Sequence, residues 1–200
     1  AAITAVGGYV PDYRLTNREL ETMVETNDEW IRTRTGVEER RILKGAGKGT
    51  SDLAAPAVQE LLRKRGIEAA EIDLLICCTT TPDMVFPATA NIICDKIGAR
   101  NAWGFDLQAA CSGFIYGLSL ADSLIRTGQA RTILLIGAET MSRLLDWNDR
   151  ATCVLFGDGA GAVVLQAHDG RGDNSDRGIL NTRIFSDGRL HDLLYTDGGP

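Results

Sequence analysis

The sequence lacks the features that mark a membrane protein or a secreted one. None of its apolar runs approaches the roughly eighteen residues that cross a bilayer, and its first residues do not have the basic and apolar regions of a signal peptide. Its five cysteines are odd in number and include no C-x-x-C pair, which argues against a disulfide framework and against a zinc site. We therefore expect a soluble, cytoplasmic protein without a bound metal and without a membrane partner.

Positive charge is scarce overall but concentrated in one segment. The net charge of −6 argues against a general nucleic-acid-binding protein. Between Arg32 and Lys48, however, six basic residues stand against two acidic ones, a net charge of +4. A basic patch on an acidic protein can receive a phosphorylated ligand or an acidic partner, and an ordinary solvated surface explains the same charge equally well.

Two glycine-rich stretches fall short of known nucleotide-binding motifs. Residues 44–50 do not form a phosphate-binding loop, because Ile42 stands where its first glycine belongs and Gly49 follows Lys48 in place of Ser or Thr. Residues 157–161 read Gly-x-Gly-x-Gly, but a strand-like run follows them where a dinucleotide site needs a helix. We predict a flexible loop for the first stretch. For the second, we predict a turn that joins two antiparallel strands.

Strand-like and helical patterns alternate along the chain. Apolar runs predict strands at residues 2–10, 72–79, 104–109, 132–137 and 179–185. Spacing of apolar residues and capping signals predict helices at residues 16–24, 27–35, 51–65, 87–97 and 111–127. Because the strands are apolar on both faces and alternate with helices, the pattern predicts an α/β fold with a mostly parallel sheet.

Cys111 stands where a strand-like run passes into a helical pattern. The unpaired N–H groups and the dipole of a helix N-terminus favour a thiolate, and a sharp strand-to-helix turn would expose it, as in a nucleophile elbow. Most cysteines, however, are small buried apolar side chains. The pattern alone leaves both interpretations of Cys111 open.

Three segments, in the same order, resemble the motifs of one family. Residues 27–36 resemble its D-E-W-I-x-x-R-T-G motif, residues 106–114 its nucleophile segment, and residues 156–162 its glycine turn. The chain is similar to the N-terminal part of a β-ketoacyl-acyl carrier protein synthase III, the initiating condensing enzyme of the thiolase-like superfamily. The resemblance implies a thiolase-like layered αβαβα fold. Residues 1–168 would be the N-terminal half with the nucleophile, and residues 169–200 a linker and the first strand of the C-terminal half.

The resemblance also implies an acyltransferase of fatty acid synthesis that needs no cofactor. The residue matching Cys111 takes an acyl group, usually acetyl, from acyl-CoA, and the acyl-enzyme condenses with malonyl-acyl carrier protein as CO2 leaves. The residues matching Trp30 and Arg150 sandwich the adenine of coenzyme A. Thr26 matches a residue that contacts the same base, and Arg34 matches one that meets the phosphates.

Two further expectations follow from the resemblance. The residue matching Phe86 lies at the acyl pocket and reaches the partner subunit, which implies a homodimer. The histidine and asparagine that serve the condensation in this family belong to the C-terminal half, beyond Pro200, and neither His168 nor His191 matches them. We interpret both histidines as surface residues, and we expect the chain to need the missing C-terminal half for activity and stability.

Three other functions remain as hypotheses. A related condensing enzyme of polyketide, quinolone or olefin biosynthesis would differ in the volume of its acyl pocket. A non-catalytic scaffold subunit would not need the thiol of Cys111. A thiol redox sensor is the weakest alternative, because no second cysteine stands near Cys111 in the sequence as a resolving partner.

Overall fold

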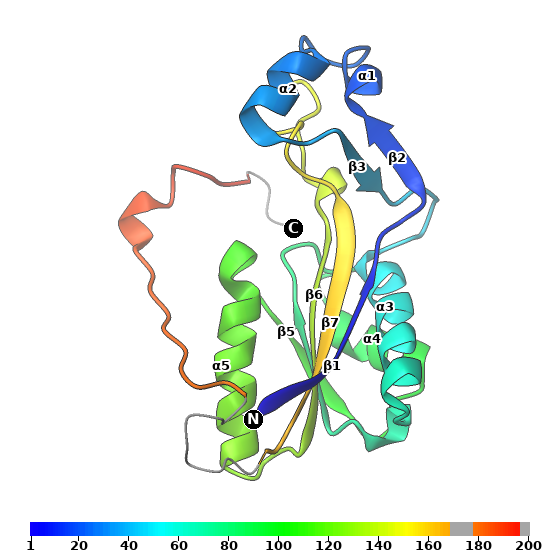
Figure 1. The fold of residues 1–200 in the computed structure, drawn as a ribbon, viewed down its shortest axis with the longest axis vertical. Helices are drawn as coiled ribbons and strands as arrows, with labels where there is room; N and C mark the ends of the chain where they lie inside the picture. The colour runs from blue at the N-terminus through cyan, green and yellow to red at the C-terminus, as the bar shows by residue number, and fades with distance from the viewer. Residues whose placement is uncertain (169–177, 197–200) are drawn as a thin grey trace.

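The computed structural model describes residues 1–168 and 178–196 and has one main sheet with helices on both faces (Figure 1). The strands of this sheet follow the order β1-β7-β6-β4-β5. Their bounds are Ala2–Tyr9 (β1), Leu74–Cys78 (β4), Trp103–Leu107 (β5), Thr132–Thr140 (β6) and Asp158–Gln166 (β7). β4 pairs in parallel with β5 and β6, whereas β7 pairs antiparallel with both β6 and β1. Within this sheet β7 therefore runs against the other four strands, which confirms the predicted mostly parallel mixed sheet.

Helices α3 (Thr50–Arg65) and α4 (Thr89–Ile97) cover one face of the sheet, and α5 (Gly113–Arg126) covers the other (Figure 1). Each face of the sheet has its own hydrophobic core, and successive side chains of β6 alternate between the two. Leu134 and Ile136 pack toward α3 and α4, while Leu135 packs toward α5. All five residues of β4 are buried. The apolar runs of the sequence thus reflect strands that are covered on both faces.

A small subdomain, residues 13–42, lies beyond one end of the main sheet (Figure 1). It contains the antiparallel pair β2 (Tyr13–Thr16) and β3 (Glu39–Ile42) and the helices α1 (Asn17–Leu20) and α2 (Asp28–Thr35). Its core includes Leu20 and Ile31 and also takes Cys153 and Val154 from the segment before β7. Residues 146–157 therefore belong physically to this subdomain, although they follow it by more than a hundred positions.

The predicted turn at residues 157–161 is wrong. Gly159 and Gly161 lie inside the single strand β7, and turns precede it at residues 151–155. The glycine that packing requires is Gly157, since a Cβ there would stand 2.9 Å from the carbonyl oxygen of Arg41. This glycine allows residues 146–157 to approach β3 closely.

Residues 179–185, the predicted first strand of a C-terminal half, form no strand within the described part of this chain, and their place in a C-terminal half stays a prediction. Residues 179–187 form no strand ladder, and Leu180 and Phe185 are 78% and 85% exposed. The segment has an apolar pattern but pairs with no strand of the described sheet, and an unpaired run cannot satisfy its backbone as a strand.

Two predictions about the C-terminal part fall outside the described residues. The linker at residues 169–177 is one, so the division into residues 1–168 and 169–200 stays a prediction. Pro200 also lies outside them, and the placement of the family's histidine and asparagine beyond Pro200 stays a prediction too. His168 and His191 are described and are both exposed, as interpreted from the sequence. No helix among the described residues combines the length and the apolar character that crossing a membrane requires.

Candidate functional site

Cys111 lies in a strained turn between β5 and α5. A short 3-10 turn, Ala110–Ser112, joins the strand to the helix, and Ala110 adopts a left-handed backbone with φ of 44°. A non-glycine residue in this region costs free energy and is a feature of sharp functional turns. The turn exposes Cys111, while Cys77, Cys78, Cys94 and Cys153 are buried. The alternative interpretation of Cys111 as a core side chain is therefore not supported.

Cys78 on β4 attaches this turn to the sheet through a hydrogen bond. Its thiol donates to the carbonyl oxygen of Gly113 at 3.2 Å, at the first residue of α5. Close packing requires glycine at the next turn of the helix, because a Cβ on Gly117 would stand 2.4 Å from Leu135 Cδ1. Burial, assisted by the charge of Glu139, raises the pKa of Cys78 to about 12. Cys78 therefore stays a neutral thiol, whereas Cys111 is open to reagents.

The N-terminus of α5 has no side chain of its own that would occupy it. Ser112 makes no capping hydrogen bond, and the first turn contains no acidic residue. The backbone N–H of Ser112 donates to Ala109 at 3.1 Å, but none of the hydrogen bonds between described residues uses the N–H of Cys111. An anion on the thiol, or on an atom bonded to it, would face the positive end of the helix and this free donor.

Trp30 and two arginines form a second cluster on the small subdomain. Asn27 begins α2 by accepting from the N–H of Trp30 at 2.8 Å, and Gly36 ends the helix with φ of 72°. The guanidinium carbons of Arg34 and Arg150 lie 4.6 Å and 4.3 Å from the centroid of the Trp30 ring. Within the described residues neither arginine forms an ion pair. The structure thus brings together three of the predicted site residues, and their two positive charges are open to an anionic ligand.

The predicted sandwich of a base between Trp30 and Arg150 is closed in this structure. A planar ring between the two groups needs a separation of about 7 Å, twice a normal contact distance. A base could therefore enter only after the side chain of Arg150 swings away from Trp30. Thr26, the fourth residue of the predicted set, is half-buried, and its hydroxyl oxygen is buried without a hydrogen-bond partner among the described residues.

Phe86 lies away from both clusters in the chain, on the loop that leaves β4. Its ring is 82% exposed, and the neighbouring Met84 and Val85 are 49% and 71% exposed. Two carboxylates hold the ends of the loop: Glu139 accepts from the N–H of Thr80 at 2.8 Å, and Asp106 accepts from the N–H of Thr89 at 2.7 Å. A fixed loop with an exposed apolar tip is what contact with a partner subunit would require.

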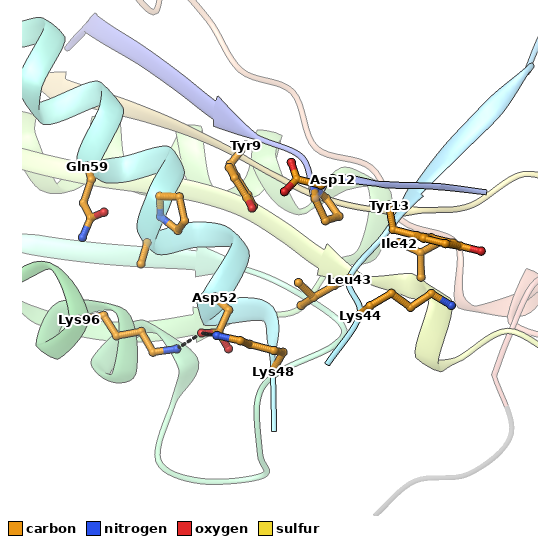
Figure 2. A pocket seen from close by; sticks show the side chains of 13 residues that line it. Tyr9, Asp12, Tyr13, Ile42, Leu43, Lys44, Lys48, Asp52, Gln59 and Lys96 are labelled. Atoms are coloured by element: carbon orange, nitrogen blue, oxygen red, sulfur yellow. Dashed lines mark hydrogen bonds and ion pairs between the residues drawn. The ribbon is translucent and has the colours of Figure 1, made fainter. Parts of the chain in front are cut away.

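A hollow of about 690 Å³ lies elsewhere, against α3 (Figure 2). Tyr9, Tyr13, Lys44, Lys48 and Asp52 are among the residues that line it, and none of the predicted site residues does. Its lysines have partners: Asp52 pairs with Lys96 at 3.0 Å and with Lys48 at 3.6 Å, and Lys44 stands over the ring of Tyr13. Lys48 and Lys96 are thus paired with a carboxylate, whereas Lys44 and Asp12, which also lines the hollow, form no ion pair among the described residues.

The fold and the turn at Cys111 define a class of protein, the thiolase-like α/β proteins that carry a cysteine between a strand and a helix N-terminus. The family model described as 3-oxoacyl-[acyl-carrier-protein] synthase III matches residues 105–188, which include Cys111. A β-ketoacyl-[acyl-carrier-protein] synthase III of Rhodospirillum centenum is 55% identical over 200 residues, covering 100% of this chain and 61% of the relative. The chain is thus similar to the members of this family, and it spans about three fifths of the length of the curated relatives it matches.

Solved structures agree with this placement. The crystal structure of 3-oxoacyl-[acyl-carrier-protein] synthase III from Aquifex aeolicus superposes with a TM-score of 0.91 at 47% identity, covering 98% of this chain and 61% of that one. The corresponding enzyme from Pseudomonas aeruginosa superposes with a TM-score of 0.87 at 40% identity, covering 100% and 61%. The predicted thiolase-like fold is confirmed.

Proposed function

We propose that the protein to which this chain belongs is an acyltransferase that initiates fatty acid synthesis. Cys111 takes an acyl group, acetyl in the first instance, from acyl-CoA. The acyl-enzyme then undergoes decarboxylative Claisen condensation with malonyl-acyl carrier protein and gives 3-oxoacyl-acyl carrier protein. The observation that carries this proposal is the exposed thiol of Cys111 in a strained turn at an uncapped helix N-terminus.

The first step is an exchange of thioesters. The thiolate of Cys111 attacks the carbonyl carbon of acyl-CoA, and the carbonyl oxygen takes the negative charge. The N–H of Cys111, which has no acceptor among the described residues, and the N-terminus of α5 support this charge. The carbon–sulfur bond to coenzyme A then breaks, and coenzyme A leaves as a thiolate. In the second step the carbanion left by loss of CO2 from the malonyl group attacks the acyl carbon and frees Cys111.

Coenzyme A binds at the cluster around Trp30 in this proposal. The indole of Trp30 and the guanidinium of Arg150 suit a planar base, Arg34 suits the phosphates, and Thr26 offers its hydroxyl to the base. Two guanidinium groups without carboxylate partners among the described residues support an anionic ligand here. Phe86 belongs to the acyl pocket in this proposal and reaches a second copy of the chain, which makes the enzyme a homodimer. The enzyme acts in the cytoplasm and requires no cofactor.

Acylation from labelled acetyl-CoA tests the proposal. The full-length protein that contains this chain should carry one label, on the peptide that includes Cys111, and Cys111→Ala should abolish the label. Cys94→Ala is the matched control, because Cys94 is buried and should leave labelling unchanged. Label that persists in Cys111→Ala, or a wild-type protein that accepts none, would contradict the assignment of Cys111.

A further inference from the structure

Arg40 is a buried charge without a carboxylate partner among the described residues. It lies on β3 and is 5% exposed, and burial lowers the pKa of its guanidinium. Its donors reach neutral acceptors: the carbonyl oxygens of Leu15 at 3.2 Å and of Val154 at 2.7 Å, and the side-chain oxygen of Asn17 at 2.9 Å. Its Nε has no hydrogen-bond partner in the part of the chain that the structure describes. Because such a buried charge is costly, its position calls for an explanation.

Arg40 joins the two segments that carry Trp30 and Arg150. On one side, its partner Asn17 donates to the Asp28 carboxylate at 2.8 Å, in the first turn of the helix that carries Trp30. On the other side, Arg40 donates to Val154, four residues after Arg150. A continuous chain of hydrogen bonds therefore runs from α2 through Asn17 and Arg40 to residues 146–157.

Residues 146–157 are themselves fixed in shape. The Asp149 carboxylate accepts from the N–H of Ala151 at 2.9 Å and from the hydroxyl of Thr152 at 2.6 Å. At the end of the segment, a Cβ on Gly157 would stand 3.0 Å from Arg40 Cβ. Arg40 thus holds this segment against β3 at Val154 and Gly157. The side chain of Arg150, among the described residues, is restrained only by its contact with Trp30.

We infer that Arg40 is a positioning residue for the base-binding pair, Trp30 and Arg150. This inference rests on the proposed coenzyme A site. Arg40 fixes the backbone from which Arg150 swings, so that its guanidinium returns over Trp30 at stacking distance when a base enters. Arg40 itself is buried and contacts no substrate. Its loss should weaken recognition of the adenine end of coenzyme A and leave the reaction at Cys111 unaffected.

The test compares two acyl donors that differ at the adenine end. Acylation of Cys111 in the full-length protein is measured with acetyl-CoA and with acetyl-pantetheine, which lacks the nucleotide. In Arg40→Met, the KM for acetyl-CoA should rise about tenfold, on the scale of a lost aromatic–base stack, with kcat retained. The rate with acetyl-pantetheine should stay at the wild-type value. Trp30→Ala should show the same split and calibrates the size of the effect.

Arg41→Met is the matched control. Arg41 neighbours Arg40 on β3, but it bonds to Pro11 and pairs with Glu39 at the surface, so both donors should react as in the wild type. If Arg40→Met does not fold, Arg40→Lys decides, since one ammonium cannot reach all three acceptors and should raise the same KM about threefold. Equal losses with both donors, or an unchanged KM for acetyl-CoA, would overturn the inference. A wild-type protein that neither donor acylates would instead overturn the proposed function.

Discussion

The helices on the two faces of the sheet begin in different ways. At α3, Asp83 accepts from the N–H of Ser51 at 2.9 Å and Asp52 from that of Gly49 at 2.8 Å. At α4, both oxygens of Asp106 accept backbone N–H groups. Among the described residues no carboxylate accepts from the N-terminus of α5, and the turn that holds the thiol of Cys111 directly precedes it. Carboxylates complement the helix dipole where a helix needs only stability, and the one place without them is where an anion must form during the proposed reaction.

Removing the carboxylate from α4 should have the largest effect on stability. Asp106→Asn replaces an anion that accepts from Thr89 at 2.7 Å and from Ala90 at 2.8 Å with an amide that offers one acceptor. We expect the free energy of unfolding to fall by about 2 kcal/mol, the scale of hydrogen bonds to a charged group. Urea unfolding of the full-length protein measures this.

Asp95→Asn is the control on the same helix, because Asp95 is exposed and should change stability by less than about 0.5 kcal/mol. Equal effects of the two substitutions would show that the carboxylate of Asp106 is not what holds the start of α4.

A carboxylate placed at the N-terminus of α5, as at α3 and α4, should raise the stability of the helix and lower the reactivity of Cys111. Ser112→Asp places an acceptor at the N-cap and should stabilise the helix by up to about 1 kcal/mol. The same charge disfavours the neighbouring thiolate, so alkylation of Cys111 by iodoacetamide at neutral pH should slow about tenfold. Ser112→Asn is the matched control, since it caps the helix without a charge and should alkylate like the wild type. Equal alkylation rates for the two variants would show that the charge at this helix end does not affect the reactivity of Cys111.

Local signals in the sequence predicted much of the fold. Asn27 and Gly36 bound α2 as predicted, and the apolar run of β4 became a strand buried on both faces. The pair β2 and β3 was missed, because its strands have four residues each, lie more than twenty positions apart and contain charges at Glu39 and Arg41. Residues 179–185 have an apolar pattern but pair with no strand among the described residues, because such a pattern does not say which strand edge is available.

The candidate site also contains residues that the sequence predicted and residues that it did not. The turn at Cys111 could be predicted from the residues themselves, because a strand, small residues and a helix start stand in sequence. The cluster of Trp30 and Arg150 came only from the resemblance to a family, since its members are 120 positions apart. No signal in the sequence predicted that Arg40 would belong to the site. Arg40 and Arg41 are the same residue type in adjacent positions, and only the alternation of β3 decides that Arg40 is buried while Arg41 is half-buried on the other face.

Asp52 should contribute least to stability among the three aspartates at the helix N-termini of α3 and α4, and its contribution should depend on pH. Burial alone would raise the pKa of Asp52, but the N–H of Gly49 and the charges of Lys96 and Lys48 outweigh it and hold the pKa below its usual value. A lowered carboxyl pKa stabilises the folded state above the unfolded pKa of about 3.9, and this contribution is lost as the pH falls through the lower folded value. Asp52→Asn should therefore cost about 0.5–1 kcal/mol at pH 7, and the difference from the wild type should shrink below about pH 4. In a Lys96→Met background the cost at pH 7 should be smaller, because one ion pair is already gone. A difference that persists undiminished at pH 3 would mean that Asp52 acts through its shape and not through its charge.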